Sequence, residues 1–423
     1  MTSATSRVPY GASPPDAWRV VPLKHLTELC NGFVFKSGAW EDTGTPILRI
    51  ENLNGSTNFN HSNLALDDRY KVTAGDLLFS WSGNPGTSFG PFRWHQDGTY
   101  YLNQHIFKVS VHGCDKNWLY WALRAATFWI ERELTSGMIG MVHVTKEELG
   151  NVPIPIPSLE EQRRIADFLD TETARLDSLS TAREAQVRCL EELWASRLAH
   201  RVEKWIATHG LVPLRRVVES VEQGWSPQCD DMIADPSEWA VLKTSAVSSG
   251  TFKPLEHKKL PHGTSPNLRY QIADGDILMT RGSGSPEHVG IPAVANPAGR
   301  RLLLSDLLYR IRLSHGWSSE FTSFVLKSQP VRGFMALLFR GQSGQTIKLR
   351  ADDIRSIDIP AVPAHLQEQY AADLAEERQA LYSAVAALRK SSALLAERRQ
   401  ALITAAVTGQ IDVSTASGRG IEE

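Results

Sequence analysis

The sequence predicts an α+β protein in which two similar mixed α/β domains alternate with two long helices that pair antiparallel as a coiled coil. Three observations predict this fold: two long stretches without Gly or Pro, a heptad repeat of Leu in the second stretch, and a series of motifs that occurs twice in the intervening segments. Antiparallel packing of the two helices relates the two halves by a pseudo-twofold axis, so we expect an internal repeat of that symmetry.

The first long helix is expected over residues 158–209. Pro157 ends an extended approach, Ser158 is suited to cap the first free amides, and Glu161 completes a Ser-x-x-Glu capping box. Apolar residues then recur at helical spacing: Leu169, Leu176, Leu190 and either Leu193 or Trp194. About 50 residues at about 1.5 Å each make a rod that needs a partner along its length, because isolated helices draw most of their stability from packing.

The second long helix, expected over residues 364–409, supplies that partner. Leu occupies every seventh position: Leu374, Leu381, Leu388, Leu395 and Leu402. This spacing predicts a heptad seam, and Gly409 is a typical stop signal. Both helices follow a Pro-rich entry and a Glu-Gln pair, which ends at Gln162 and Gln369. Pairing Gln162 with Gln369 implies one extra residue in the second entry, counted from Pro157 and Pro363.

The segments outside the helices predict two globular regions, residues 17–157 and 210–363, with tails at 1–16 and 410–423. The first region contains strand-like segments at residues 46–50, 76–80 and 100–109, and an amphipathic helix at 118–134. Its motif Tyr70-x-Val-x-x-Gly75-Asp76 returns as Tyr270-x-Ile-x-x-Gly275-Asp276. A tandem duplication with loop insertions explains this repetition.

Composition limits the class of protein. The chain of 423 residues is 42% hydrophobic and 22% charged, with a formal net charge of −2, which is an ordinary globular composition. This charge argues against nonspecific coating of nucleic acid but allows a local basic cleft. The 4 Cys and 13 His lack metal-ligand spacing, so we expect no metal site. No apolar run is long enough to cross a bilayer, and we expect a cytoplasmic protein.

Catalytic motifs are missing from the sequence. There is no G-x-x-x-x-G-K-[ST] loop for a nucleoside triphosphate and no G-x-S-x-G elbow. The pairs Asn84-Pro85 and Asn296-Pro297 lack the following aromatic residue with which amino-methyltransferases hold a flipped base. We therefore assign no catalytic residue and expect a protein that reads rather than reacts.

The repeated helix entry, the two long helices and the ending Leu394-Leu-Ala-Glu-Arg-Arg-Gln-Ala-Leu-Ile403-Thr-Ala-Ala-Val-Thr-Gly409-Gln-Ile-Asp-Val413 resemble the specificity subunits of type I restriction-modification systems. The similarity covers residues 18–413. It implies that each globular region is a target recognition domain that reads one half of a split, asymmetric target in double-stranded DNA. It also implies that the helices set the spacing and dock two methyltransferase subunits of a phage defence complex, which endonuclease subunits then join. S-adenosylmethionine and ATP would be bound by those partners, so no cofactor is expected in this chain.

Candidate DNA contacts fall in loops that differ between the two copies. They are Trp81, Ser82, Asn84, Asn103, Gln104 and His105 in the first region, and Arg281, Ser283, His288, Asp306, Gln342, Gln345 and Lys348 in the second. Amide and guanidinium groups are the types that read base edges, and Arg93 beside Trp94 is suited to a backbone or stacking contact. The alternatives are unliganded turns, hydrogen bonds inside the domain and solvated loops.

Candidate partner contacts lie on the faces of the long helices: Arg163, Arg164, Glu191, Arg398 and Arg399. Solvated charges are the alternative for each. An alternative for the whole chain is a coiled-coil scaffold whose globular ends bind protein rather than DNA. The favoured hypothesis places two half-sites about one helical turn of DNA apart.

Overall fold

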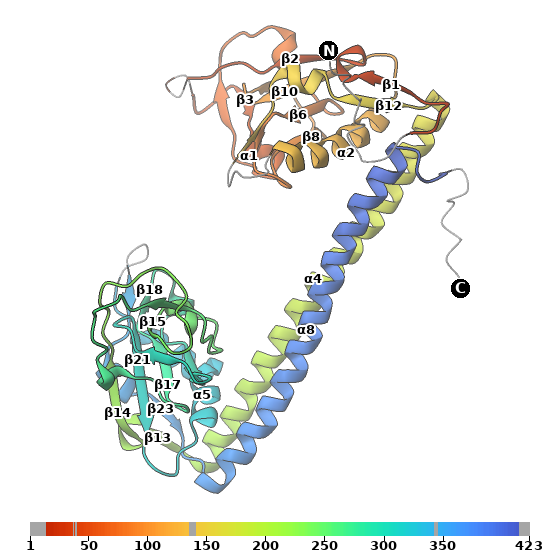
Figure 1. Cartoon of the computed structure of the whole chain (residues 1–423). Coiled ribbons are helices and arrows are strands. Elements are labelled where there is room, and N and C mark those ends of the chain that lie inside the picture. Colours follow the sequence, from red (N-terminus) through yellow and green to blue (C-terminus); the bar gives the residue numbers. More distant parts are fainter. Residues whose placement is uncertain (1–13, 37, 39, 135–140, 342–345, 414–423) are drawn as a thin grey trace. The chain divides into compact units, whose positions relative to one another are not determined.

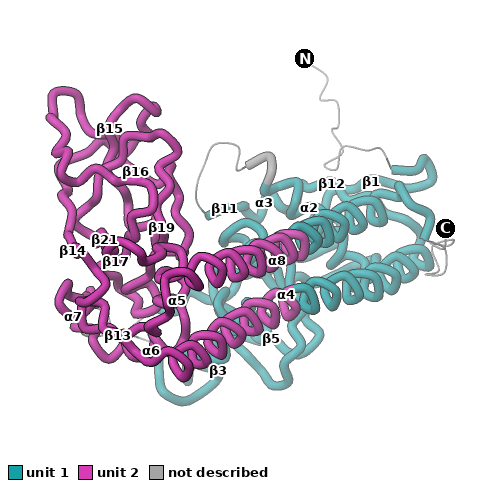
Figure 2. Tube along the Cα trace, turned by 90° about the horizontal axis from the view of Figure 1, so that it is seen from below, with its two compact units in different colours: residues 1–183, 390–423 teal, residues 184–389 magenta. Residues whose placement is uncertain are grey.

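The computed structural model describes residues 14–36, 38, 40–134, 141–341 and 346–413. The chain divides into two compact units, residues 1–183 with 390–423 and residues 184–389 (Figure 2). Each unit contains one globular module and one half of each long helix. We call residues 17–157 module 1 and residues 210–363 module 2. The two tails lie largely outside the described residues.

Module 1 is built on a four-stranded antiparallel sheet with a second sheet beside it. The first sheet has the order β2 (Thr27–Asn31), β10 (Ile106–Val111), β6 (Leu77–Ser80), β8 (Gly90–Arg93). The second has the order β4 (Asn60–Ser62), β3 (Thr45–Leu48), β9 (Tyr100–Leu102), β5 (Lys71–Val72). Two short pairs complete the strands: β1 (Arg19–Pro22) with β12 (Pro153–Ile156), and β7 (Ser82–Gly83) with β11 (Val142–His143).

Helix α2 (Lys116–Leu134) covers the first sheet at β8, and the short helices α1 (Ile50–Leu53) and α3 (Lys146–Gly150) lie in connections (Figure 1). The core of module 1 continues into the long helices of its unit, because Leu169 and Ile403 are fully buried in the same cluster as Trp118. The predicted helix over 118–134 is confirmed.

Module 2 repeats this topology. Its main sheet has the order β14 (Val218–Gln223), β21 (Leu308–Leu313), β17 (Ile277–Thr280), β19 (Pro292–Val294). The second sheet has the order β16 (His257–Lys259), β15 (Trp239–Leu242), β20 (Arg301–Leu303). The short pairs are β13 (Leu211–Pro213) with β23 (Asp358–Pro360), and β18 (Gly282–Ser283) with β22 (Ile347–Lys348). Its helices are α5 (Ser319–Lys327), α6 (Gln329–Leu337) and α7 (Ala351–Arg355).

The repeated Gly-Asp motif makes the same turn in both modules. Gly75 and Gly275 both have positive φ, at 87° and 81°. The carboxylate Oδ2 of Asp76 accepts from Thr73 N at 2.8 Å, and that of Asp276 accepts from Ala273 N at 2.9 Å. The internal repeat predicted from the motif is therefore confirmed.

The strand expected over residues 100–109 is wrong in one respect. It consists of two strands, β9 and β10, which lie in different sheets. Between them Asn103, Gln104 and His105 form a turn closed by the hydrogen bond from Ile106 N to Asn103 O at 3.2 Å. The apolar pattern continues through the turn because both strands are buried, so periodicity alone does not show the break.

The long helices are α4 (Leu159–His209) and α8 (Ala364–Val407), close to the predicted ranges (Figure 1). They pair antiparallel. In the second unit Arg389 Nη2 lies 3.2 Å from Glu191 Oε1, and Arg201 pairs with Glu377, so the numbers rise along α4 as they fall along α8. In the first unit Arg399 Nε lies 2.8 Å from Asp177 Oδ1.

The seam agrees with the heptad prediction, since Leu374 is fully buried. At the position left open on α4 the packed residue is Trp194, whose ring centroid lies 6.3 Å from that of Phe324, whereas Leu193 is 45% exposed. Ser158 Oγ accepts from Glu161 N at 3.3 Å, as the capping motif predicts.

A buried glutamine fixes the entry of each long helix. Gln162 Oε1 accepts from Asp115 N at 2.7 Å, and its Nε2 donates to Pro157 O at 2.9 Å. Gln367 makes the same two bonds, from Ser318 N at 2.9 Å and to Val362 O at 2.8 Å. Each glutamine therefore ties the start of a long helix to the start of α2 or α5.

This geometry corrects the pairing of Gln162 with Gln369. The equivalent of Gln162 is Gln367, 205 positions later, the same separation as between Pro155 and Pro360. Gln369 is exposed, and the second entry has no extra residue. The Glu-Gln dipeptide matches by type alone, whereas the buried position is set by two backbone groups that need a partner.

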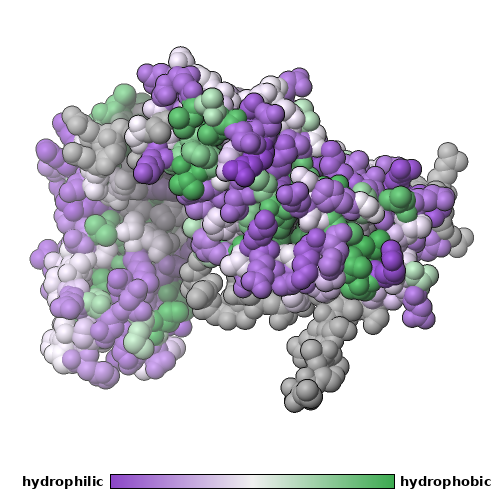
Figure 3. All heavy atoms as spheres, turned by 90° about the horizontal axis from the view of Figure 1, so that it is seen from above, coloured by the Kyte–Doolittle hydropathy of each residue, from purple (hydrophilic) through white to green (hydrophobic). Residues whose placement is uncertain are grey.

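The surface in Figure 3 is mainly hydrophilic, and its hydrophobic side chains gather in small patches. Among the described residues, no helix is both long enough and apolar enough to span a membrane. In the same part of the chain, His, Cys, Asp and Glu form no cluster of three that is suited to a metal ion.

Candidate nucleic-acid interface

Three segments of each module meet beside the end of strand β6 or β17, and we call this place the tip. Tip 1 consists of residues 81–84, 103–105 and 142–144, and tip 2 of residues 281–284, 305–307 and 347–349. In tip 1, Trp81 N donates to His105 O at 3.2 Å and Val144 N donates to Trp81 O at 3.0 Å.

Tip 2 has the same backbone pattern. Arg281 N donates to Leu307 O at 2.9 Å, and Leu349 N donates to Arg281 O at 2.9 Å. These bonds pair the positions of the two modules: Trp81 with Arg281, Gln104 with Asp306, His105 with Leu307, and His143 with Lys348. The backbone is thus built twice while the side chains differ.

A glycine is required beside each tip. A Cβ on Gly32 would lie 2.1 Å from Asn103 O, and one on Gly224 would lie 2.1 Å from Leu304 O. Real Cβ atoms do not approach backbone oxygens so closely, so both positions need glycine for the strand to pass under the tip.

Tip 1 is aromatic and carries neutral hydrogen-bonding groups. Trp81 Nε1 donates to Gln104 O at 2.9 Å, and its ring centroid lies 5.2 Å from that of His105 and 6.2 Å from that of His143. Burial lowers the pKa of His105, and His143 and Arg49 lower it further. The His105 ring therefore stays neutral at pH 7, with Gln104 Nε2 at 3.1 Å from its Nε2.

Tip 2 is cationic. Lys348 is exposed on β22, and Arg281 is half-buried at the end of β17. Asp306 supplies a carboxylate, which accepts from the Ser226 hydroxyl, while Gln223 Nε2 donates to the backbone oxygen of Asp306 at 3.1 Å. The two tips thus differ in charge as well as in shape.

The remaining candidates of the tips are distributed as follows. Asn84 is exposed, and its backbone oxygen accepts from Ser88 N at 3.1 Å, so its side chain projects from a closed turn. Ser82 is buried in β7, Ser283 is half-buried in β18 and His288 is exposed. Gln342 and Gln345 lie outside the described residues.

Arg93 lies apart from tip 1. Its Nη1 is 2.8 Å from Asp170 Oδ1 of α4, and its guanidinium carbon is 4.2 Å from the Tyr120 ring centroid. These contacts tie β8 to α2 and α4. The structure does not bring Arg93 together with the other candidates.

His143 was not among the predicted site residues. The signal for it was present in the sequence, because His143 lies 205 positions before Lys348, which was predicted. Carrying Lys348 back through the repeat finds it. Ser226, the partner of Asp306, has no such signal, since its position depends on how β14 ends.

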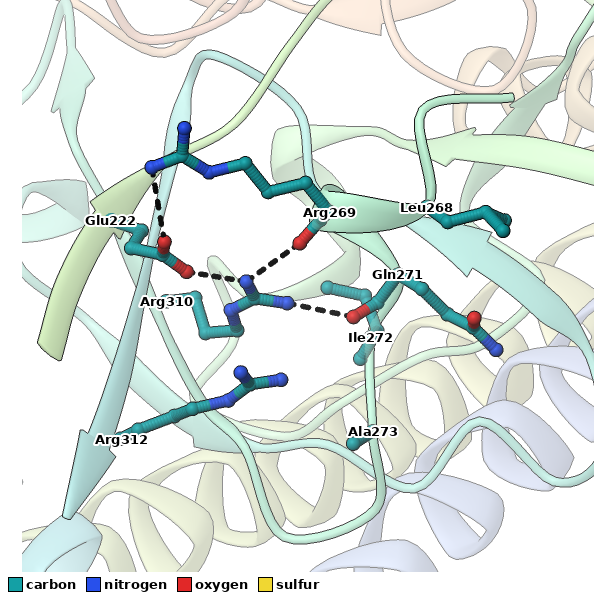
Figure 4. Close-up of a pocket in the computed structure, with 8 residues that line it drawn as sticks. All are labelled: Glu222, Leu268, Arg269, Gln271, Ile272, Ala273, Arg310 and Arg312. Carbon is teal, nitrogen blue, oxygen red and sulfur yellow. Dashed lines mark hydrogen bonds and ion pairs between the residues drawn. The ribbon is translucent and has the colours of Figure 1, made fainter. Parts of the chain in front are cut away.

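A second group of arginines in module 2 is committed to internal contacts (Figure 4). Arg310 is fully buried, pairs with Glu222, and donates to Gln271 O at 2.7 Å and to Arg269 O at 2.9 Å. Arg312 Nε lies 3.0 Å from Asp276 Oδ1. The equivalent pair in module 1 is Lys108 with Asp76, at 2.9 Å.

The candidate docking residues fall into two groups. Arg163, Arg164 and Arg398 are exposed, although Arg164 lies 3.4 Å from Glu160. Glu191 and Arg399 instead join the two long helices, through Arg389 and Asp177. The first group is free to meet a partner, whereas the second stabilises the helix pair.

The repeated modules and the antiparallel helix pair define a class of two-module proteins, and comparisons with known proteins agree with it. Residues 15–188 match the family model described as the type I restriction modification DNA specificity domain. The chain is 25% identical over 380 residues to the EcoKI specificity subunit of the type I restriction enzyme of Escherichia coli strain K12. That alignment covers 81% of this chain and 78% of the relative.

Two further similarities concern one segment and the fold. The chain is 30% identical over 154 residues to the EcoEI specificity subunit of Escherichia coli, which is 36% of this chain and spans 26% of that protein's length. A chain solved in work on complex assembly and conformational transition of the type I R-M system matches with a TM-score of 0.69. This match has 16% identity and covers 95% of this chain and 100% of that chain, so it shows a shared fold. The chain resembles type I specificity subunits along most of its length, as its sequence motifs predicted.

Proposed function

We propose that this protein is the sequence-specific DNA-binding subunit of a type I restriction-modification complex, and that each tip reads one half of an asymmetric, bipartite target. The observation that carries the proposal is the repeated tip, in which equivalent backbone positions bear different side chains. Tip 1 presents Trp81, Gln104 and His143 where tip 2 presents Arg281, Asp306 and Lys348. Two identical supports with unlike side chains suit two unlike half-sites.

The side chains offer distinct contacts to bases. The Gln104 amide matches the paired donor and acceptor of adenine, and Arg281 matches the two acceptors of guanine in the major groove. The Asp306 carboxylate is suited to accept from the amino group of cytosine, and exposed Lys348 suits a phosphate or guanine. Trp81 and His143 add aromatic surface beside Gln104.

Reaction chemistry belongs to partner proteins in this proposal. The chain positions two methyltransferase subunits on the paired helices, and endonuclease subunits join them. S-adenosylmethionine and ATP bind in those partners. Arg163, Arg164 and Arg398 are the docking candidates that remain exposed, and we propose that they contact a methyltransferase subunit.

Tip variants test the proposal when the chain is expressed with its methyltransferase partner and genomic methylation is mapped by sequencing. We expect Gln104→Ala and His143→Ala to relax one half of the target, and Arg281→Ala and Lys348→Ala to relax the other. Each loss of a paired base contact costs about 1–3 kcal/mol of discrimination. Lys258→Ala is the matched control, because it removes an exposed cation of module 2 away from the tip and should leave the target unchanged.

A scaffold that binds only protein makes the opposite prediction. All four tip variants would then methylate the same sites as the unmodified protein, and loss of DNA selectivity would appear in none of them. Equal relaxation of both halves by every variant would also contradict separate reading by the two tips.

A further inference from the structure

Two cations line one pocket where module 2 packs against the long helices of its own unit. Lys327 ends α5, and Arg378 lies on α8. Both approach Phe324, with Lys327 Nζ at 5.7 Å and the Arg378 guanidinium carbon at 4.8 Å from its ring centroid. The pocket has a volume of about 350 Å³, and Gly250, Phe252, Asn296, Ala298 and Glu320 are among its other lining residues. A smaller pocket next to it shares Lys327 and Arg378 and reaches Trp194 and Tyr382.

These two cations are not neutralised within the described part of the chain, where neither forms an ion pair. Glu320 is the carboxylate that lines the pocket, and it is exposed. Burial lowers the pKa of Lys327 to about 7, the neighbouring Arg378 lowers it further, and Glu320 opposes the shift. Two like charges beside an aromatic ring are costly without a counterion.

Module 1 contains a similar pair of cations, but with a counterion. Arg124 occupies the position of Lys327, since both lie nine residues after the start of equivalent helices at Asp115 and Ser318. Arg399 approaches Trp121 there at 6.0 Å, and Asp177 neutralises it at 2.8 Å. The pairing of Gln162 with Gln367 fixes the equivalent of Asp177 on α8, and that residue is Tyr382.

The rim of the pocket is strained. Ala298 has a φ of 51°, and it is the non-glycine residue in the left-handed region among those described. The Asn296 side chain holds it, because Oδ1 accepts from Ala298 N at 3.1 Å. Such strain persists where a surrounding structure requires the conformation, and it concentrates at binding sites.

We propose that the pocket of Lys327 and Arg378 binds a small oxyanion, such as phosphate or a carboxylate, which supplies the negative charge that Asp177 supplies in module 1. The ammonium and guanidinium groups donate hydrogen bonds to the oxyanion, and Phe252 and Phe324 form apolar walls that reduce competition from water. This site is separate from both tips, and it does not depend on DNA recognition.

Inorganic phosphate is the probe, titrated calorimetrically into the full chain at constant ionic strength set by chloride. We expect one saturable site. Lys327→Met and Arg378→Met each weaken binding by about tenfold or more, since each removes a charged donor. At pH near 7, binding should be accompanied by proton uptake, measured in buffers of different ionisation enthalpy, because a bound anion favours the charged form of Lys327.

Tyr382→Asp is the sharper variant. Tyr382 is 45% exposed, so the substitution leaves the core intact. It places a carboxylate one helical turn from Arg378 and should weaken phosphate binding about as much as losing a cation. Arg124→Met in module 1 is the matched control and should bind phosphate as the unmodified protein does.

Three results would overturn the proposal. They are the absence of saturable phosphate binding by the unmodified chain, unchanged affinity in Tyr382→Asp, and equal loss of affinity in Arg124→Met. If acetate competes with phosphate, the site takes oxyanions in general; if phosphate alone binds, the ligand class narrows to phosphates.

Discussion

At the scale of single residues, Glu222 makes module 2 sensitive to acid. The hydrogen bond from Arg310 lowers the pKa of Glu222, and Arg269 adds to the effect, whereas burial opposes it. A carboxylate with a depressed folded-state pKa contributes stability above its unfolded pKa, about 4.3, and that stability is lost as pH falls through the folded value. We therefore expect Glu222→Gln to be less stable than the unmodified protein at pH 7.

Urea denaturation at pH 7 and at about pH 3.5 checks this expectation. The difference between the two proteins should shrink at the lower pH, because the carboxylate is then increasingly protonated. Glu219→Gln is the control on the same strand, where the side chain is exposed. A difference for Glu222→Gln that does not change with pH would contradict the role of its charge.

The buried glutamines at the helix entries give a second prediction at this scale. Gln162→Ala and Gln367→Ala each leave a backbone donor and a backbone acceptor unpaired inside the protein. We expect each to lower the free energy of unfolding by about 1–3 kcal/mol, measured by chemical denaturation. Gln369→Ala removes the residue that the sequence motif favours, but Gln369 is exposed, and this variant should change stability by less than about 0.5 kcal/mol.

At the scale of elements, the sequence predicts long features better than short ones. The ranges of α4 and α8 follow from heptads, Pro and Gly, because a local pattern sustained over many residues leaves few alternatives. The break between β9 and β10 does not follow, because it depends on which sheet each strand joins. The tips were found in part: the loops at Asn84 and Arg281 stand out as differences between copies, whereas His143 becomes evident when the β7–β11 pairing is known.

The helix seam gives a prediction for one element. Leu374 of α8 is fully buried against module 2 and α4, whereas Leu394 on the same helix is 54% exposed. Leu374→Ala should cost about 2–5 kcal/mol through lost burial and the cavity it leaves. Leu394→Ala should be nearly neutral in the same denaturation experiment, and similar losses for both variants would argue against a defined seam.

At the scale of the whole molecule, duplication makes the two modules interchangeable in principle. Each module is closed by the same short antiparallel pair, with Val21 opposite Ile154 in module 1 and Val212 opposite Ile359 in module 2. The buried glutamine that follows is also equivalent. A module can therefore be exchanged at these strands without changing how the chain enters either long helix.

A chain in which residues 21–155 replace residues 212–360 carries tip 1 twice. If each tip reads one half-site independently, the asymmetric target should become symmetric, with two inverted copies of the half read by module 1. Methylation mapping of cells that express this chain with the methyltransferase partner measures the outcome. The reciprocal chain with two copies of module 2 is the control, and it should select inverted copies of the other half. An unchanged asymmetric target would show that the modules do not read separately, whereas a folded chain that binds the partner but methylates no defined sequence would show that each tip depends on the other.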